Sequence, residues 1–193
     1  MLKFNKTKGC MQKMIRRKVF ISHYKGDRIE VDNFIKRFGH LFIPKVLGAN
    51  DNDEFINSTD TDYVMRRIRE KYLDDSTVTI VLLGSCTHSR RYVDWEIKSS
   101  LSHGAYTFPN GLIGIVLPSQ KNTCHLPSRL EDNWNQQHQN CYARYWSYPS
   151  SDQQLVEWIE DAYLARSSRK HLIKNSKVML GYNAKCRIDG VTH

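Results

Sequence analysis

The segment from Ser89 to Leu101 carries an aromatic ring and a carboxylate at a spacing that could support chemistry. On a helix, Tyr92 and Glu96 are four residues apart and therefore share a face. That face borders an apolar stripe that includes Val93 and Ile97, so the Glu96 carboxylate would be partly withdrawn from water. A carboxylate in such a place can stabilise a developing positive charge or transfer a proton.

The spacing around Glu96 also allows a simpler interpretation. Arg91 and Lys98 lie close to it in sequence, and a solvated ion pair with either base would give Glu96 no chemical role. Other familiar catalytic or phosphate-binding patterns are not indicated, because the sequence holds no Walker A, GxGxxG, HExxH or GxSxG motif.

A second group of residues has the chemistry of zinc ligands. Cys124 and His125 are adjacent, and His138 precedes Cys141 by three positions. Adjacent ligands rarely converge on one ion, so loop residues beside a core are the competing and simpler interpretation. The chain has five cysteines and no CxxC pair, which favours reduced thiols and predicts no metal site.

Apolar runs alternate along the chain with amphipathic helical stripes. Strands are expected at Val19–Ile21, Phe42–Leu47, Val78–Leu83, Gly111–Leu117 and Ala143–Tyr148. Helices are expected at Val31–Phe38, Val64–Tyr72, Arg91–Leu101 and Leu155–Leu164. Gly39 should end the first helix, Thr59 or Thr61 should cap the second, and one of residues 150–152 should cap the last. Residues 1–14 are expected to be mobile, and residues 48–60 and 119–140 to form loops.

Strands that alternate with helices predict an α/β fold, a flavodoxin-like three-layer sandwich with a mainly parallel sheet of about five strands. Pro44 directs its strand to a sheet edge. Ligands in such folds bind beyond the carboxyl ends of the strands. Two of these ends carry the polar turns Ser22–Tyr24 and Gly84–Ser85.

The net charge of +9 resides in the two ends of the chain. Residues 1–26 hold eight bases and no acid, and residues 166–193 hold seven bases and one acid, so the body between them is negative, at −5. A nucleic-acid-binding domain should instead carry its basic charge on a folded face, so a nucleic-acid partner ranks last among the functions considered. No apolar run reaches the roughly 20 residues that a membrane helix needs, and we expect a cytoplasmic protein without a membrane partner.

Three segments, in order, resemble a TIR-like domain: VFISHYKGD (Val19–Asp27), STVTIVLLGS (Ser76–Ser85) and SRRYVDWEIKSSL (Ser89–Leu101). They are most similar to the small bacterial TIR-like proteins of the Thoeris antiphage system. The later pattern ARYWSYPSSDQQLVEWIEDAY (Ala143–Tyr163) also resembles that group. The resemblance predicts a TIR-like domain over residues 17–164 and leaves unexplained a basic leader over 1–16 and a basic extension over 165–193.

The resemblance implies an enzyme that cleaves NAD⁺ at its nicotinamide–ribose bond. Glu96 would be the catalytic residue. Substrate-binding residues would be Ser22 at the end of the first strand, Tyr92, Phe20, Tyr24 and Arg91. NAD⁺ would be the substrate, and no cofactor would be needed. The product would be a cyclic, ADP-ribose-derived messenger that activates a partner effector in antiphage defence.

Self-association is expected, because one isolated domain offers only part of a closed pocket; TIR domains carry a loop that governs assembly where residues 48–60 lie here. The alternative is a TIR-like module that acts by assembly without catalysis. A Glu96 that is partly buried beside an open pocket would favour the enzyme, and a Glu96 locked in a salt bridge with no cavity would favour the module.

Overall fold

The computed structural model describes residues 15–46, 60–73, 75–104, 107–120 and 124–192. The strands are β1 (Lys18–His23), β2 (Ile43–Val46), β3 (Val78–Leu83), β4 (Gly111–Val116) and β5 (Arg144–Trp146). The α-helices are α1 (Arg28–Phe38), α2 (Thr61–Ile68), α3 (Arg91–Leu101), α4 (Ser128–Asp132) and α5 (Asp152–Ser168). A wider π-helical turn, η2 (Arg69–Leu73), continues α2, and three short 3₁₀ turns complete the elements, η1 (Lys25–Asp27), η3 (Thr87–Ser89) and η4 (Lys170–Leu172).

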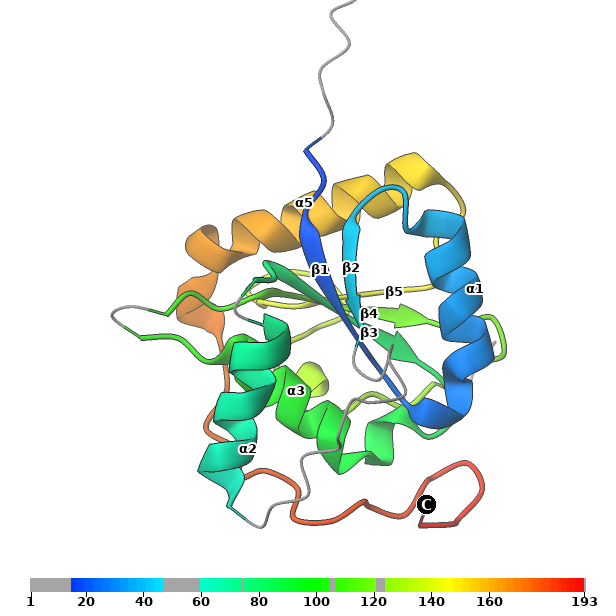
Figure 1. Ribbon diagram of the computed structural model, residues 1–193, viewed down its shortest axis with the longest axis vertical. Helices are drawn as coiled ribbons and strands as arrows, with labels where there is room; N and C mark the ends of the chain where they lie inside the picture. The colour runs from blue at the N-terminus through cyan, green and yellow to red at the C-terminus, as the bar shows by residue number, and fades with distance from the viewer. Residues whose placement is uncertain (1–14, 47–59, 74, 105–106, 121–123, 193) are drawn as a thin grey trace, which may run out of the picture.

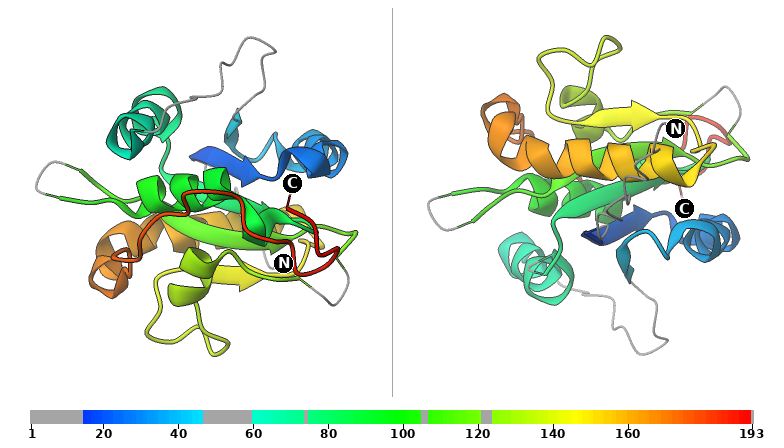
Figure 2. Two further views of the ribbon diagram at one scale, coloured as in Figure 1. Left: turned by 90° about the horizontal axis from the view of Figure 1, so that it is seen from below. Right: turned by 90° about the horizontal axis from the view of Figure 1, so that it is seen from above.

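The five strands form one parallel sheet in the order β2-β1-β3-β4-β5. Helices α1 and α5 pack on one face, and α3 and α4 pack on the other (Figures 1 and 2). This three-layer arrangement confirms the predicted α/β flavodoxin-like sandwich. Among the described residues, no helix combines the length and apolar character needed to cross a bilayer.

The central strand β3 shows why the sequence folds in this way. All six of its side chains are buried, as expected for a β-branched run that is covered on both faces. Val78, Ile80 and Leu82 pack toward α1 and α5, and Val81 and Leu83 pack toward α3 and α4. At the start of β4, Gly111 lets α5 approach closely, since a Cβ there would lie 2.0 Å from the carbonyl oxygen of Ala162.

Most expected elements are confirmed, with four differences. The cap of α2 is Asp60, whose Oδ1 accepts a hydrogen bond from the Tyr63 N–H at 3.0 Å. The prediction that Thr61 caps this helix is therefore wrong, and the alternative cap, Thr59, lies outside the described residues. Helix α5 is longer than predicted and begins at the expected cap Ser151. The segment predicted as irregular contains α4, and residues 173–192 pack along α3. The expected leader and the loop at 48–59 lie outside the described residues.

Candidate active site

Glu96 and Ser22 meet at the carboxyl end of β1. Ser22 Oγ donates to Glu96 Oε2 at 2.5 Å, and both side chains are buried, with Glu96 only 3% exposed. Burial raises the pKa of the Glu96 carboxyl to about 8, although the hydrogen bond from Ser22 opposes this rise. The carboxyl is therefore mostly neutral at pH 7 in this state of the protein.

The surface ion pair considered for Glu96 is wrong. Within the described part of the chain, no base lies within salt-bridge distance of Glu96. The Arg91 guanidinium instead donates to the carbonyl of Gly181 and to the Tyr92 hydroxyl. The Lys98 ammonium donates to backbone carbonyls of the segment that follows α5. Helix α3 turns Glu96 toward the sheet and its bases toward this segment.

Apolar side chains border the Glu96–Ser22 pair. Phe20 lies two residues before Ser22 on the same face of β1 and packs in a cluster with Trp95. Tyr92 packs against this cluster, and its ring meets that of Trp95 edge to face, with the centroids 5.3 Å apart. The structure therefore brings the predicted residues Phe20, Ser22, Tyr92 and Glu96 into one neighbourhood, and their roles stay predictions.

The predicted residue Tyr24 belongs to a second group at the same edge of the sheet. The Arg90 guanidinium lies 4.0 Å from the centroid of its ring, so Tyr24 packs with Arg90, while Arg91 lies over Tyr92. Asp27 comes three residues after Tyr24 in the chain, and burial raises the pKa of its carboxyl to about 6. Thr87 Oγ1 donates to Asp27 Oδ2 at 3.3 Å. The spacing of residues along the chain does not reveal Arg90 and Asp27, because isolated charged residues in loops give no periodic signal.

A buried ion pair fixes the helix that carries Glu96. Arg129 of α4 is fully buried and donates from Nε to Asp94 Oδ1 at 3.0 Å. The other Asp94 oxygen accepts from the backbone N–H of Leu180 at 3.0 Å. The ion pair therefore joins α3 to α4 and to the segment after α5. Its members lie far apart in sequence, so spacing could not reveal it.

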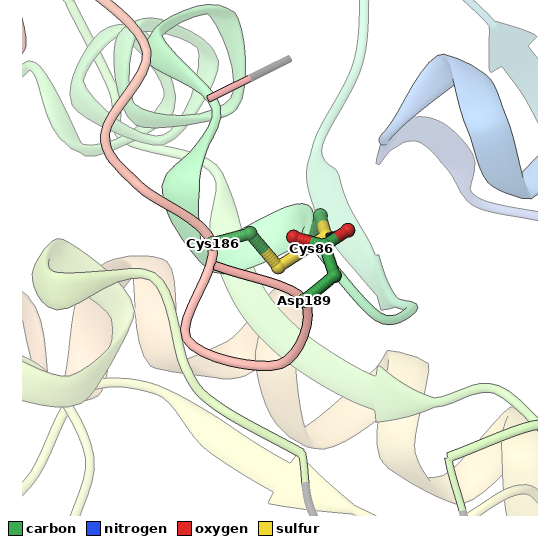
Figure 3. A group of neighbouring side chains, drawn as sticks. All are labelled: Cys86, Cys186 and Asp189. Carbon is green, nitrogen blue, oxygen red and sulfur yellow. Dashed lines mark hydrogen bonds between the residues drawn. A yellow bond between two sulfur atoms is a disulfide. The ribbon is translucent and has the colours of Figure 1, made fainter. Parts of the chain in front are cut away.

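The cysteine composition predicted reduced thiols throughout, and this prediction is wrong for two of the cysteines. Cys86 and Cys186 form a disulfide whose Cα atoms are 5.4 Å apart, while Cys124 and Cys141 are free. Among the described residues, the one group that brings three potential metal-ligand atoms together is Cys86, Cys186 and Asp189 (Figure 3). The zinc hypothesis for Cys124 and Cys141 and the histidines near them is therefore not supported.

A cavity of about 280 Å³ lies at the opposite end of the strands, where β3 and β4 begin. Its lining includes Arg69, Ser100, Asn110 and Arg166, but neither Glu96 nor Ser22. Glu96 and Ser22 themselves are buried in this structure, with Glu96 3% and Ser22 0% exposed, although the predicted residues converge on them.

These features define a class of protein. A parallel sheet in this order, with an acidic residue of α3 bonded to the serine of β1, is the arrangement expected of a TIR-like α/β domain. The sequence matches the family described as Thoeris protein ThsB, TIR-like domain, over residues 20–122. The chain belongs to this family, which confirms the resemblance and makes it a defence-related TIR-like protein. A search of the curated proteins finds no match.

The family match begins inside β1 and ends after β4. It includes Ser22, Tyr92 and Glu96. Helices α4 and α5, strand β5 and the segment over residues 173–192 lie beyond the matched range.

Proposed function

We propose that this protein cleaves the nicotinamide–ribose bond of NAD⁺, with Glu96 as the catalytic residue, and makes an ADP-ribose-derived, cyclic messenger for antiphage defence. The observation that carries the proposal is the contact between Glu96 and Ser22 at the carboxyl edge of the sheet, in a chain of the ThsB TIR-like family. Ligands of open α/β sheets bind at this edge.

One carboxylate is sufficient for this reaction. Ordinary glycosides need a second carboxyl group because an alkoxide leaves poorly without a proton. The nicotinamide of NAD⁺ is a pyridinium, so it leaves as a neutral molecule and needs no general acid. The ribose left behind develops oxocarbenium character, which an ionised Glu96 would stabilise. Ser22 would hold the carboxylate in place or contact a ribose hydroxyl.

The neighbouring residues supply binding surfaces for the rest of NAD⁺. Tyr92, which is half-buried, offers an aromatic face on which a nicotinamide or adenine ring can stack, and Phe20, which is fully buried here, would join it once the site opens. Tyr24 and Arg91 would approach the diphosphate, and Arg90 adds a cation beside Tyr24. The product is decided by the nucleophile that reaches the oxocarbenium ion. Exclusion of water favours attack by a group of the same molecule and hence a cyclic product.

The closed state of the site sets two requirements for catalysis. The Glu96 carboxyl must reach the substrate, and it must ionise, whereas here it is buried and its pKa is raised to about 8. Entry of the cationic nicotinamide ring favours the ionised form, since an opposite charge nearby lowers the pKa of a carboxyl. We also propose that the protein is active in an assembled form, in which a second copy completes the pocket. An effector protein would then respond to the product.

Product analysis tests the proposal. Purified protein is incubated with NAD⁺, and the products are identified by chromatography and mass spectrometry beside Glu96→Gln. Glu131→Gln, which alters an exposed carboxylate of α4, is the matched control. We expect nicotinamide and an ADP-ribose product from the wild type and the control only. Equal nicotinamide release from the Glu96→Gln protein would reject the assignment.

The burial of Glu96 favours a second candidate, a TIR-like module that assembles without catalysis. In that case Glu96 would only join α3 to β1. Sedimentation of the wild type with and without NAD⁺ separates the two candidates when it is combined with the product analysis. Assembly with intact NAD⁺ would support the module.

A further inference from the structure

Residues 173–192 form an extended segment that follows α5 and its short 3₁₀ turn, and we refer to it as the strap. It has no regular helix or strand, yet it is anchored along the helix that carries Glu96. In Figure 1 it runs along the bottom of the molecule below α2 and α3, and Figure 2, left, shows it crossing α3. The strap lies outside the range of the family match.

Two backbone groups and one side chain of the strap bind the first turns of α3. The Trp95 indole N–H donates to the carbonyl of Leu180 at 2.8 Å, and the Leu180 N–H donates to Asp94 at 3.0 Å. The N–H of Arg91, at the start of the helix, donates to Asn183 Oδ1 at 3.0 Å and is capped by it. These contacts involve the residues immediately before Glu96, so the strap holds the helix turn that carries the carboxyl group.

One apolar side chain of the strap packs against the apolar cluster that borders the site. Met179 packs against the cluster that contains Phe20 and Trp95, with Tyr92 alongside. Phe20 and Tyr92 are the aromatic residues assigned to the substrate rings. The strap therefore packs against the cluster that supplies one of these rings, and Glu96, on the same helix as Trp95, is only 3% exposed.

The far end of the strap is covalently fastened. Cys186 is bonded to Cys86, which follows β3 and precedes α3, so the anchor lies in the loop that leads into the catalytic helix (Figure 3). The Ala184 N–H donates to the carbonyl of Ser89 at 2.8 Å, and the Arg187 N–H donates to His88 Nε2 at 3.0 Å. With this bond closed, a strap that detaches stays tethered beside its binding surface and rebinds at once.

We propose that the strap is an autoinhibitory element that holds the Glu96 site closed, and that the Cys86–Cys186 disulfide is its redox-sensitive latch. This inference rests on the proposed function, because it concerns access to the same site. A dithiol reductant opens the latch by two thiol–disulfide exchanges. A reductant thiolate attacks one cysteine sulfur, which forms a mixed disulfide and releases the other cysteine as a thiolate. The second thiol of the reductant then attacks the reductant sulfur of the mixed disulfide and releases the first cysteine. Two cysteine thiols and the cyclic disulfide of the reductant result.

Once opened, the latch has a device that slows its closure. Asp189 Oδ2 lies 3.4 Å from Cys86 Sγ (Figure 3). A carboxylate beside a freed thiol disfavours the thiolate, which is the species that re-forms a disulfide. With the disulfide open, only the main chain at its α5 end still tethers the strap, so the remaining hydrogen bonds and the Met179 contact must hold the rest of it in place.

Hydrogen exchange tests the latch without reference to activity. Exchange of the Leu180 and Ala184 amides is measured in oxidised wild type, in wild type treated with dithiothreitol, in Cys186→Ser and in Cys141→Ser. We expect exchange to rise about tenfold or more after reduction and in Cys186→Ser. Cys141→Ser, which removes a buried free thiol elsewhere, should match the oxidised wild type. Unchanged exchange after reduction would overturn the latch, and reduction of the wild type supplies this result even if Cys186→Ser does not fold.

NAD⁺ binding and cleavage then test whether the strap closes the site. Binding is measured by calorimetry on Glu96→Gln, oxidised and reduced, and cleavage on the wild type in the same two states. Tighter NAD⁺ binding after reduction, by about tenfold, supports the strap as a cover. Equal binding in both states overturns it. If binding tightens but neither state of the wild type releases nicotinamide, the proposed function fails while the strap stands.

Discussion

The raised pKa of Glu96 predicts that this residue destabilises the folded protein at alkaline pH. The folded carboxyl titrates at a pKa of about 8, against 4.5 without burial, so the unfolded chain ionises first as the pH rises. The folded state therefore holds the extra proton, and the stability that Glu96 contributes is complete below pH 4.5 and is lost as the pH rises toward 8. Each pH unit in that window lowers the free energy of unfolding by about 1.4 kcal/mol.

The perturbation is Glu96→Gln, which keeps the shape of the side chain and its ability to bond Ser22 but cannot ionise. Between pH 5 and pH 8, the wild type should lose about 3 to 4 kcal/mol of unfolding free energy relative to the variant. Urea unfolding followed by tryptophan fluorescence, with both proteins in the same redox state, measures the difference. Glu131→Gln, an exposed carboxylate, controls for the loss of charge. Parallel pH curves for wild type and Glu96→Gln would refute the burial argument.

Three further outcomes follow from other contacts. Arg129→Met should lower the free energy of unfolding by about 3 to 5 kcal/mol, because it leaves the buried Asp94 carboxylate without its base. Adding Asp94→Leu should recover part of this loss, and a double variant less stable than Arg129→Met would contradict the role given to the ion pair. Gly111→Ala should lower the melting temperature strongly, since its Cβ would lie 2.0 Å from the carbonyl oxygen of Ala162, and a wild-type melting temperature would count against this packing. At pH 8, iodoacetamide should alkylate the thiol of Cys124 roughly 100-fold more slowly than it alkylates the thiol of glutathione, because burial raises the pKa of the Cys124 thiol to about 11. Equal alkylation rates of the two thiols, measured by mass spectrometry, would oppose that shift.

The sequence predicted the elements whose periodicity is complete. Strand β3 and helix α3 have the predicted bounds, because a continuous β-branched run and a regular apolar stripe each specify one kind of element. Helix α4 was missed, because it has five residues and its main anchor is a buried arginine instead of an apolar stripe. Periodicity cannot detect an anchor of that kind.

The candidate site was predictable in its members but not in its state. Spacing placed Glu96 beside the apolar stripe of α3, and the resemblance added Ser22. The depth of burial and the raised pKa depend on β1 and the neighbouring elements, which the spacing within one helix does not describe. The Cys86–Cys186 bond joins residues 100 positions apart, and the strap binds mainly through backbone groups, so neither leaves a pattern in the sequence.

The central claim is that one carboxyl group, Glu96, drives loss of nicotinamide from NAD⁺. Its most direct measurement is the initial rate of nicotinamide release by the reduced wild type, by Glu96→Gln and by the control Glu131→Gln under identical conditions. We expect Glu96→Gln to release nicotinamide about 100-fold more slowly, or slower still, while the control keeps the wild-type rate. Equal rates for the wild type and Glu96→Gln, or no release by the reduced wild type, would contradict it.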